Sequence, residues 1–370
     1  MPRIDAFLKL AREQGCSDVH LAVGLPPMLR MFGELLPIKF RDLEGRELTT
    51  YLHEIMTPLQ QERFRAGGDL DFSYHATAVG RFRVNLYHKS TGPGAAFRYV
   101  PEEVPTIDKL GLPPILRRLL DYQQGMILIT GSTGMGKSTT LAALIDHINF
   151  SRALNIVSLE DPIEFIHRSQ RAQVIQREIG THVSSFVTGL RAALREDPDV
   201  ILVGELRDSE SIEMAMTAAE TGHLVLATLH TTSAVKSLDR IIDALPPEQR
   251  DQGKTFLAQN LLGVVTQVLV KNAEGRGRRA IFETMVTTKA IAKLIMTDKI
   301  HLLPSLIQTG RDHGMQLMDQ ALLAALEAKL IDPDQAYEFA LDKKPFKRYV
   351  TDSSLLASLQ DPTWLGDERS

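Results

Sequence analysis

The chain has 370 residues, of which 44% are hydrophobic and 24% charged, as in soluble globular proteins long enough for two or three domains. Its net charge of −4 gives no support to bulk nucleic-acid binding. No apolar run approaches the roughly 18 residues of a membrane span, and residues 1–10 break their apolar stretch with charges, unlike a secretory signal. The single cysteine, Cys16, excludes an internal disulfide and a multi-cysteine zinc site. These observations favour the cytoplasm.

The first hundred residues carry the pattern of a small α+β domain. Ile4, Phe7, Leu8 and Ala11 fall on one face of a helix. Short strand-like stretches follow at residues 19–23, 28–32, 71–74, 81–88 and 95–100. We therefore expect one α+β domain over residues 1–100, and a linker at residues 101–114, where four prolines stiffen the backbone and remove hydrogen-bond donors.

Residues 115–370 show a different pattern, in which apolar runs alternate with helical segments. The runs suit buried parallel strands, so the alternation predicts a doubly wound α/β core. From about Pro246 onward we expect mostly helix, with one hairpin around residues 275–279. The predicted strands lie at residues 126–130, 155–159, 200–203 and 224–229.

The run G-S-T-G-M-G-K-S at residues 131–138 matches the phosphate-binding pattern G-x-x-x-x-G-K-[ST] in full, between a predicted strand and a predicted helix. Backbone N–H groups of such a loop and the N-terminus of its helix form a positive hollow for phosphates. We expect Lys137 to contact the β- and γ-phosphates of ATP and Ser138 to bind Mg²⁺. The predicted nucleotide-binding residues are Gly131, Ser132, Thr133, Gly134, Met135, Gly136, Lys137, Ser138 and Thr139.

Acidic residues follow two predicted strands at the edge where ligands collect in parallel sheets. One strand runs into E-D-P-I-E, from Glu160 to Glu164, and another runs into Glu205. Asp199 precedes that second strand, and six extended residues of about 3.3 Å put it roughly 20 Å from Glu205, at the wrong edge. Glu205 is therefore the predicted metal ligand. A solvated acidic loop explains single acids of the first group, but explains the whole set less well.

Two histidines bracket the strand at residues 224–229. Seven extended residues separate His223 from His230 by about 23 Å, so both cannot contact one γ-phosphate. His230 lies at the carboxyl edge and is the better nucleotide sensor. A structural or intersubunit role explains His223 at least as well.

Two arginines alternate with apolar residues in G-R-F-R-V-N-L-Y, which places Arg81 and Arg83 on one face of a strand. A solvated sheet face explains them. An arginine that neutralises transition-state charge from outside the P-loop domain explains them equally well.

Four long stretches read G-S-T-G-M-G-K-S-T-T-L-A-A, L-E-D-P-I-E-F-I-H, A-L-R-E-D-P-D-V-I-L-V-G-E-L-R-D and A-E-T-G-H-L-V-L-A-T-L-H-T-T-S-A. In this order they resemble the Walker A, Asp, Walker B and His boxes of the secretion ATPase superfamily, and most closely its PilT/PilU branch of type IV pilus motors. The similarity extends to S-D-V-H-L near the N-terminus and G-M-Q-L-M-D-Q-A-L near the C-terminus.

The resemblance implies a PAS-like N-terminal domain, a RecA-like ATPase domain with a helical C-terminal region, and a homohexameric ring. It makes Glu164 the catalytic glutamate, Glu205 the Walker B glutamate, and His223 and His230 the His box pair. It also implies that the arginines at 81 and 83 reach nucleotide at a domain or subunit boundary. The implied activity is ATP- and Mg²⁺-dependent pilus retraction or disassembly.

The implied partner is a platform protein of the inner membrane, to which the motor docks from the cytoplasm through protein contacts. Extension ATPases of this superfamily carry extra N-terminal sequence and usually a four-cysteine zinc motif. This sequence shows neither feature, which favours the retraction branch. The retraction motif A-I-R-N-L-I-R-E, however, appears here as A-I-A-K-L-I-M-T at residues 290–297. An accessory PilU-like ATPase that depends on a paralogue is therefore an alternative. A RecA-like DNA motor is another alternative. The acidic net charge argues against it, and we expect no nucleic-acid partner.

Overall fold

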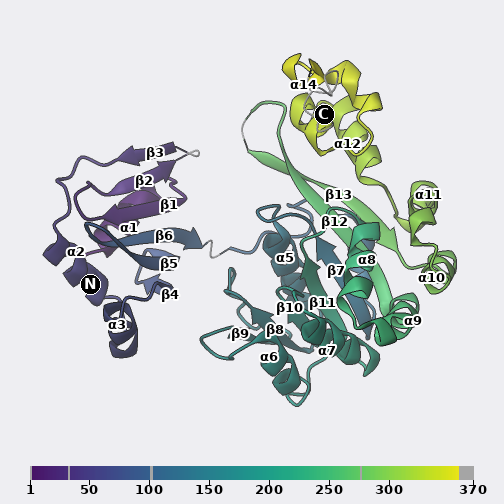
Figure 1. Ribbon diagram of the computed structural model, residues 1–370, viewed down its shortest axis with the longest axis horizontal. Helices are drawn as coiled ribbons and strands as arrows, with labels where there is room; N and C mark the ends of the chain where they lie inside the picture. The colour runs from purple at the N-terminus through teal and green to yellow at the C-terminus, as the bar shows by residue number, and fades with distance from the viewer. Residues whose placement is uncertain (1, 32–33, 101–102, 276, 358–370) are drawn as a thin grey trace, which may run out of the picture. The chain divides into compact units, whose positions relative to one another are not determined.

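The computed structural model describes residues 2–31, 34–100, 103–275 and 277–357. The chain forms two compact units, Met1–Glu103 and Val104–Ser370 (Figure 1). The predicted linker overlaps this division, and its residues 101 and 102 lie outside the described residues. From Val104 onward the proline-rich stretch belongs to the second unit, because Ile107 and Leu112 are buried in that unit's core.

The first unit is an antiparallel sheet with helices packed on it. Its strand order is β3-β2-β1-β6-β5-β4. The strands are β1 (Asp18–Ala22), β2 (Met28–Met31), β3 (Glu34–Pro37), β4 (Leu70–Ala76), β5 (Gly80–Lys89) and β6 (Gly92–Val100), and the helices are α1 (Asp5–Glu13), α2 (Gly45–His53) and α3 (Pro58–Arg65). The apolar face predicted for the first helix is confirmed, since all four of its residues are buried.

Strand β5 shows how this sheet is sided. Phe82, Val84 and Leu86 are buried in the core, whereas Arg81 and Arg83 point to the other face, as the alternation predicts. One strand and two helices of this unit, β3, α2 and α3, follow weaker patterns for which the sequence makes no prediction. The expected α+β composition of this unit is nevertheless what its elements show.

The second unit is built on a sheet with the order β13-β12-β7-β11-β10-β8-β9. All neighbouring strands from β12 to β9 run parallel, and only β13 is antiparallel to its neighbour. The strands are β7 (Gly125–Thr130), β8 (Asn155–Glu160), β9 (Gln173–Glu178), β10 (Val200–Val203), β11 (Leu224–Leu229), β12 (Leu261–Lys271) and β13 (Arg278–Val286). The four predicted strands are β7, β8, β10 and β11, each within one residue of its predicted ends.

Helices cover both faces of this sheet, which is why its central strands are apolar on both sides. In β7, Met126 and Leu128 belong to one core, while Ile127 and Ile129 belong to the other. The second core contains residues of α4 and α5, and the first contains residues of α6 to α11. The helices of this part are α4 (Ile115–Leu120), α5 (Lys137–Ser151), α6 (Phe186–Ala193), α7 (Ser209–Glu220), α8 (Ala234–Ala244), η1 (Pro247–Gln249) and α9 (Arg250–Asn260).

After α9 the chain returns to the sheet with one hairpin, and the elements that follow the hairpin are helices, which confirms the expected mostly helical C-terminal part with a single hairpin. Strands β12 and β13 span 11 and 9 residues and form a hairpin, and β12 pairs directly with β7. The hairpin turn near residue 275 is where the glycines predict it, although Arg276 lies outside the described residues. Buried polar residues interrupt the apolar pattern of both strands, among them Thr266, Gln267 and Glu283.

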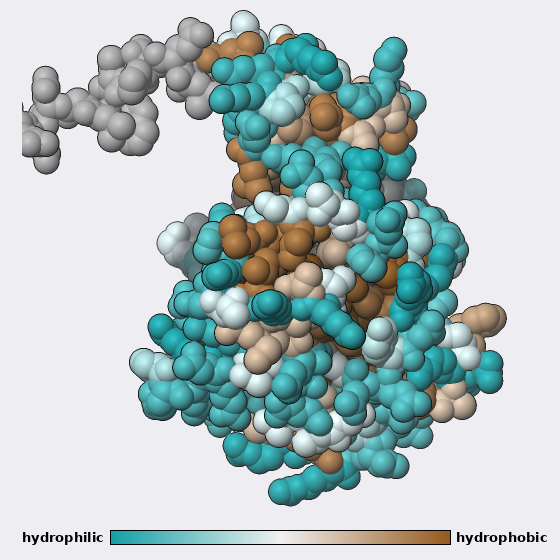
Figure 2. Space-filling model, turned by 90° about the vertical axis from the view of Figure 1, so that its right-hand side faces the viewer, coloured by the Kyte–Doolittle hydropathy of each residue, from teal (hydrophilic) through white to brown (hydrophobic). Residues whose placement is uncertain are grey.

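The remaining helices pack on this hairpin and on one another. They are α10 (Lys289–Met296), η2 (Ile300–Leu302), α11 (Leu303–Thr309), η3 (Arg311–His313), α12 (Met318–Glu327), α13 (Pro333–Phe339), η4 (Lys344–Tyr349) and α14 (Ser354–Ala357). Leu322 and Leu326 of α12 are buried in a core that includes Val270 and Ile281 of the hairpin. Figure 2 shows apolar side chains gathered at the level of α10 and α11. Met296 and Leu302, which end α10 and η2, are 55% and 43% exposed.

Within the described ranges, we find no helix whose length and apolar character would let it cross a bilayer.

Candidate active site

The phosphate-binding run forms a tight loop between β7 and α5. Gly131, Gly134 and Gly136 have φ angles of +145°, +78° and +83°, which glycine adopts without the steric cost that other residues meet. A Cβ atom on Gly131 would also lie 2.5 Å from the backbone oxygen of Gln267. These glycines therefore let the chain turn sharply and enter α5 with its N-terminal N–H groups free for a ligand.

A cavity of about 460 Å³ lies beside this loop. Six of the nine predicted loop residues line it: Thr133, Gly134, Gly136, Lys137, Ser138 and Thr139. Gly131, Ser132 and Met135 instead line a separate cavity of about 250 Å³ behind the loop, together with residues of β12, α12 and α13. The loop thus has a front that faces the larger cavity and a back that faces the C-terminal helices.

Lys137 is buried at the base of the larger cavity. Its Nζ donates to the backbone oxygens of Gly131 and Ser132, at 2.7 and 3.2 Å. Burial lowers the pKa of Lys137, while the charges of Glu205 and Glu164 act to raise it. The ammonium group is therefore held against the loop by hydrogen bonds, and it interacts electrostatically with both predicted acids.

The acids come from the carboxyl ends of neighbouring parallel strands, as strand-edge geometry predicts. Strands β8 and β10 pair side by side, and Glu160, Asp161, Glu164 and Glu205 all line the cavity. Asp199 lies at the opposite end of β10, where its carboxylate accepts a hydrogen bond from the N–H of Asn155 at 2.8 Å. The sheet thus brings the first four acids together and keeps Asp199 away.

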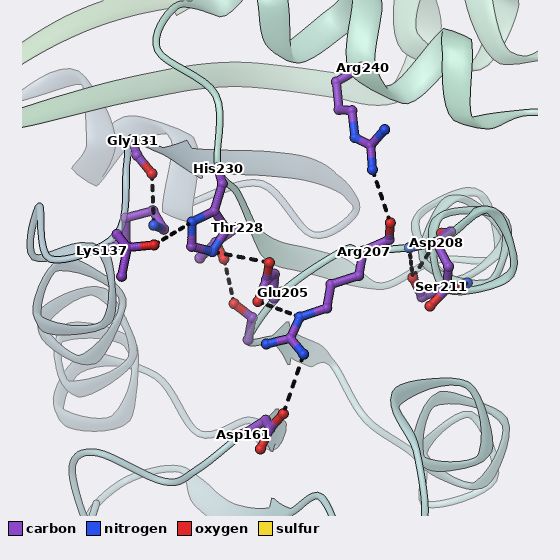
Figure 3. A network of polar contacts seen from close by, with 12 residues as sticks. Gly131, Lys137, Asp161, Glu205, Arg207, Asp208, Ser211, Thr228, His230 and Arg240 are labelled. Carbon is purple, nitrogen blue, oxygen red and sulfur yellow. Dashed lines mark hydrogen bonds and ion pairs between the residues drawn. The ribbon is translucent and has the colours of Figure 1, made fainter.

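Glu205 lies at the centre of a polar network (Figure 3). His230 Nε2 lies 3.1 Å from its Oε1, and Arg207 Nε donates to its Oε2 at 2.7 Å. Arg207 also lies 3.7 Å from Asp161 as an ion pair. His230 Nδ1 lies 3.1 Å from Thr133 Oγ1 in the phosphate loop. The ends of β10 and β11 and two loops are therefore linked through one carboxylate.

The residues present fit a magnesium ion. The Ser138 hydroxyl and the Glu205 carboxylate both line the cavity, and hard oxygen ligands are those that Mg²⁺ prefers. Across the described part of the chain, no three His, Cys, Asp or Glu side chains form a cage for a metal. Magnesium typically takes only one or two protein ligands and completes its shell with phosphate oxygens and water.

Three other predicted residues are not among those that line this cavity. His223 precedes β11, at the end opposite to His230, and its Nδ1 lies 2.8 Å from the backbone oxygen of Ala218. Arg81 and Arg83 belong to the first unit. Arg81 donates to Ser73 Oγ at 2.8 Å, and Arg83 lies 3.9 Å from Asp71.

The site also includes residues that the sequence did not single out, some in the cavity wall and one, Arg207, in contact with Glu205. Arg207 follows Glu205 by two residues, and that proximity was the available signal for it. His167 lines the cavity from the end of the Asp box stretch, and its ring is 3.8 Å from Asp146 of α5. Leu269 and Arg278 reach it from the β12–β13 hairpin, which long-range strand pairing, and no local motif, places beside β7.

Comparisons with known proteins identify the family and several relatives of this chain. The family model described as "Type II/IV secretion system protein" matches residues 3–330. The "Type IV pilus retractation ATPase PilT" of Pseudomonas aeruginosa is 44% identical over 337 residues, which cover 91% of this chain and 98% of that protein. The "Type IV pilus ATPase PilU" of the same organism is 37% identical over 318 residues, 86% of this chain and 83% of that protein. A crystal structure of the pilus retraction motor PilT with bound ADP has a TM-score of 0.88 at 39% identity, covering 94% of this chain and 99% of that one.

Proposed function

Since the chain belongs to the type II/IV secretion system protein family, we propose that it is an ATP-hydrolysing motor that retracts or disassembles a type IV pilus. The observation that carries this proposal is the convergence of a phosphate-binding loop, two strand-end glutamates and a histidine on one cavity. The similarity to PilT along 98% of that protein's length supports the choice of the pilus as the motor's load.

Nucleotide binding falls to the phosphate loop and the start of α5. Lys137 Nζ, now held by two backbone oxygens, would turn to the β- and γ-phosphates, whose charge is a stronger attraction for an ammonium group. Backbone N–H groups of the loop add neutral donors. Ser138 and Glu205 would hold Mg²⁺, which would supply charge neutralisation at the phosphate oxygens.

Hydrolysis requires a group that orients and polarises the attacking water. We assign this role to Glu164, whose carboxylate lines the cavity close enough to affect Lys137. Glu160 is the alternative in the same stretch. Its Oε1 already accepts hydrogen bonds from Ser158 at 2.7 Å and Gln176 at 3.1 Å, which supports Glu164 as the group free to act on water.

His230 is the proposed sensor of nucleotide state. A neutral imidazole carries one donor and one acceptor nitrogen, so this ring can accept from Thr133 and donate to Glu205 at once. A γ-phosphate that enters the loop competes for Thr133, and a metal competes for Glu205. Either event would change the contacts of His230, which leads directly into the loop before α8.

We further propose that six copies assemble into a ring. In that ring Arg81 and Arg83 of the first unit, together with His223, would serve nucleotide at domain or subunit boundaries. Two observations support this assignment. His223 belongs to the second unit but does not line its cavity, and the two arginines belong to the other unit. Turnover could then rotate rigid units against one another, which is how a ring converts hydrolysis into movement.

The motor would work in the cytoplasm at the inner face of the membrane, attached to a platform protein through protein contacts. Helix α10 is the proposed docking element, because it carries the stretch that replaces the retraction motif and exposes Met296. In this helix Ile291 and Ile295 are buried and two further residues pack against the core, so the exposed positions 289, 290, 293 and 296 are available to a partner. The absence of the motif's arginines supports an accessory role beside a paralogous pilus ATPase as the second candidate.

A deletion strain tests the proposal. Deletion should increase surface pili and stop or slow retraction, and the wild-type gene should restore both, whereas a Glu164→Gln gene should restore neither. If only a strain that also lacks a paralogue shows the defect, the accessory role holds. Unchanged piliation and retraction in a strain without any paralogue contradicts a pilus motor, and phosphate release by the purified protein then reports whether the ATPase assignment survives.

A further inference from the structure

Gln267 is a buried polar residue directly behind the phosphate loop. It follows Thr266, which is paired with Thr130, the last residue of β7 before the loop begins. Its exposed fraction is 1%. Gln267 lines the smaller cavity behind the loop and is not among the residues that line the larger one. It is therefore placed to contact the loop from the side opposite to the proposed nucleotide.

Both ends of the Gln267 amide are used in this position. Its Nε2 donates a short hydrogen bond to the backbone oxygen of Met135, in the middle of the loop. Its Oε1 accepts from Thr140 Oγ1 in the first turn of α5, at 2.8 Å. The backbone oxygen of Gln267 is also the atom that leaves room only for a glycine at position 131. One residue of β12 thus contacts the start and middle of the loop and the helix that follows.

The bond to Met135 fixes the direction of a neighbouring donor. A trans peptide is planar, and its C=O and N–H groups point in opposite directions. The C=O of Met135 and the N–H of Gly136 belong to one such peptide. Because Gln267 holds that oxygen toward the back of the loop, the N–H of Gly136 is turned toward the larger cavity, which Gly136 lines.

We infer that Gln267 is a positioning residue for nucleotide: it holds the Met135–Gly136 peptide so that the Gly136 N–H faces phosphate before the ligand arrives. This inference rests on the nucleotide site of the proposed function. Glycine at 136 has a φ of +83° and lacks the side chain that would restrict this peptide, so an external anchor replaces that restriction. An anchored donor avoids the ordering cost that a mobile loop incurs on binding.

The test compares Gln267→Glu with Thr140→Val in the full-length protein. A glutamate keeps the acceptor for Thr140 but has no N–H for Met135, and in its ionised form its charge repels that oxygen. Valine at 140 keeps the shape of threonine and removes only the other hydrogen bond. Both variants leave a buried polar group without its partner and so are expected to lower the melting temperature. Only the first disturbs the peptide of Gly136.

The affinity for a fluorescent ADP, measured with Mg²⁺ and again with EDTA, separates the effect of the hydrogen bond to Met135 from that of the hydrogen bond to Thr140. We expect Gln267→Glu to weaken ADP at least about tenfold in both buffers, which corresponds to one lost interaction of ordinary strength, and Thr140→Val to stay within a few-fold of wild type. Equal affinity losses in the two variants, or an unchanged affinity in Gln267→Glu, overturn the inference.

Gln267→Met provides a second variant if the glutamate prevents folding, since methionine keeps the length and lacks the donor. It should weaken ADP as Gln267→Glu does, and an unchanged affinity in a folded Gln267→Met protein also overturns the inference. Lys137→Ala is the control for the site itself. If Lys137→Ala loses ADP while both Gln267 variants keep it, only the positioning role fails; if Lys137→Ala binds normally, the phosphate-loop assignment fails.

Discussion

Glu205 accepts two cationic or donor groups at once, Arg207 at one oxygen and His230 at the other. Glu164 lines the same cavity from the loop after β8. The two glutamates therefore differ in what surrounds them, although both derive from strand ends. This difference supports a division of labour in which Glu205 serves the metal and Glu164 serves the water.

Glu164→Gln separates binding from hydrolysis. An amide keeps the size of the side chain but cannot act as a base toward water, and loss of a general base typically costs about 10²- to 10⁴-fold in turnover. We expect turnover to fall by that amount while the affinity for ADP stays within a few-fold. Phosphate release and fluorescent ADP binding by the purified protein measure the two quantities.

Glu160→Gln is the matched control, because Glu160 belongs to the same stretch and is already hydrogen-bonded to Ser158 and Gln176. It should retain most of the turnover. If Glu160→Gln is the inactive variant and Glu164→Gln hydrolyses ATP normally, the two roles are exchanged.

At the scale of elements, one buried carboxylate joins two helices to the sheet. Glu283 of β13 is 3% exposed. It accepts from the N–H of Ala234 at 2.7 Å and from the N–H of Met318 at 3.3 Å, which are the first residues of α8 and α12. A negative charge is favourable at each helix N-terminus. The helix that follows His230 and the helix that opens the C-terminal layer are therefore held by the same side chain.

Glu283→Gln should lower the free energy of unfolding by about 1 to 3 kcal/mol, since the amide nitrogen cannot accept from an N–H and one buried backbone donor is left without a partner. Glu274→Gln, in the exposed hairpin turn, should change it by less than about 0.5 kcal/mol. Urea unfolding measures both. Equal stability of the two variants would show that the bridge contributes nothing.

The same comparison predicts a dependence on pH. Burial raises the pKa of Glu283 above its ordinary value of 4.5, and the two backbone hydrogen bonds offset only part of that effect. A carboxyl group with a raised folded pKa contributes stability that is present below the unfolded value and lost as pH rises through the folded one. The stability difference between wild type and Glu283→Gln should therefore narrow as pH rises above 4.5. A difference that widens over this range contradicts the assignment.

Elements that depend on local pattern could be predicted, and those that depend on pairing could not. Strands β7, β8, β10 and β11 are apolar on both faces, and the phosphate loop is one contiguous motif, so each carries its own signal. Strand β12 contains the buried polar residues Thr266 and Gln267. They interrupt the apolar pattern by which a buried strand is recognised, although this strand contributes to the site. Glu205 was found because strand length fixes the edge at which a residue lies. Arg207 was missed because its role depends on which way its side chain turns.

At the scale of the whole molecule, the arginines of the first unit are the test of assembly. Arg83→Ala should leave ADP affinity within a few-fold but reduce turnover by about 10³-fold or more, the amount that an arginine acting on transition-state charge contributes. Arg63→Ala, on the exposed part of α3, is the control and should remain active.

Mixing subunits then shows whether the arginine acts on its own chain or on a neighbour. Arg83→Ala and Lys137→Ala subunits, each inactive alone, should recover part of the turnover when mixed and reassembled, because a boundary site can combine an intact loop from one chain with an intact arginine from another. No recovery, together with a monomeric mass by light scattering in the presence of nucleotide, would contradict the ring.

The apolar clusters of the described residues are each confined to one unit: one cluster draws on residues 4–97, and the others begin at residue 107 or later. Because each hydrophobic core lies within one unit, the two units should unfold separately and give two heat-absorption peaks in a calorimeter. ADP at about 100 times its dissociation constant stabilises the species that binds it by about 2.7 kcal/mol, so only the step that melts the phosphate loop should move to higher temperature. A single step that shifts as a whole would show that the units melt together. With two steps, the melting temperature of the unit that carries Arg83 would serve as an internal reference for the shift that the nucleotide causes in the other unit.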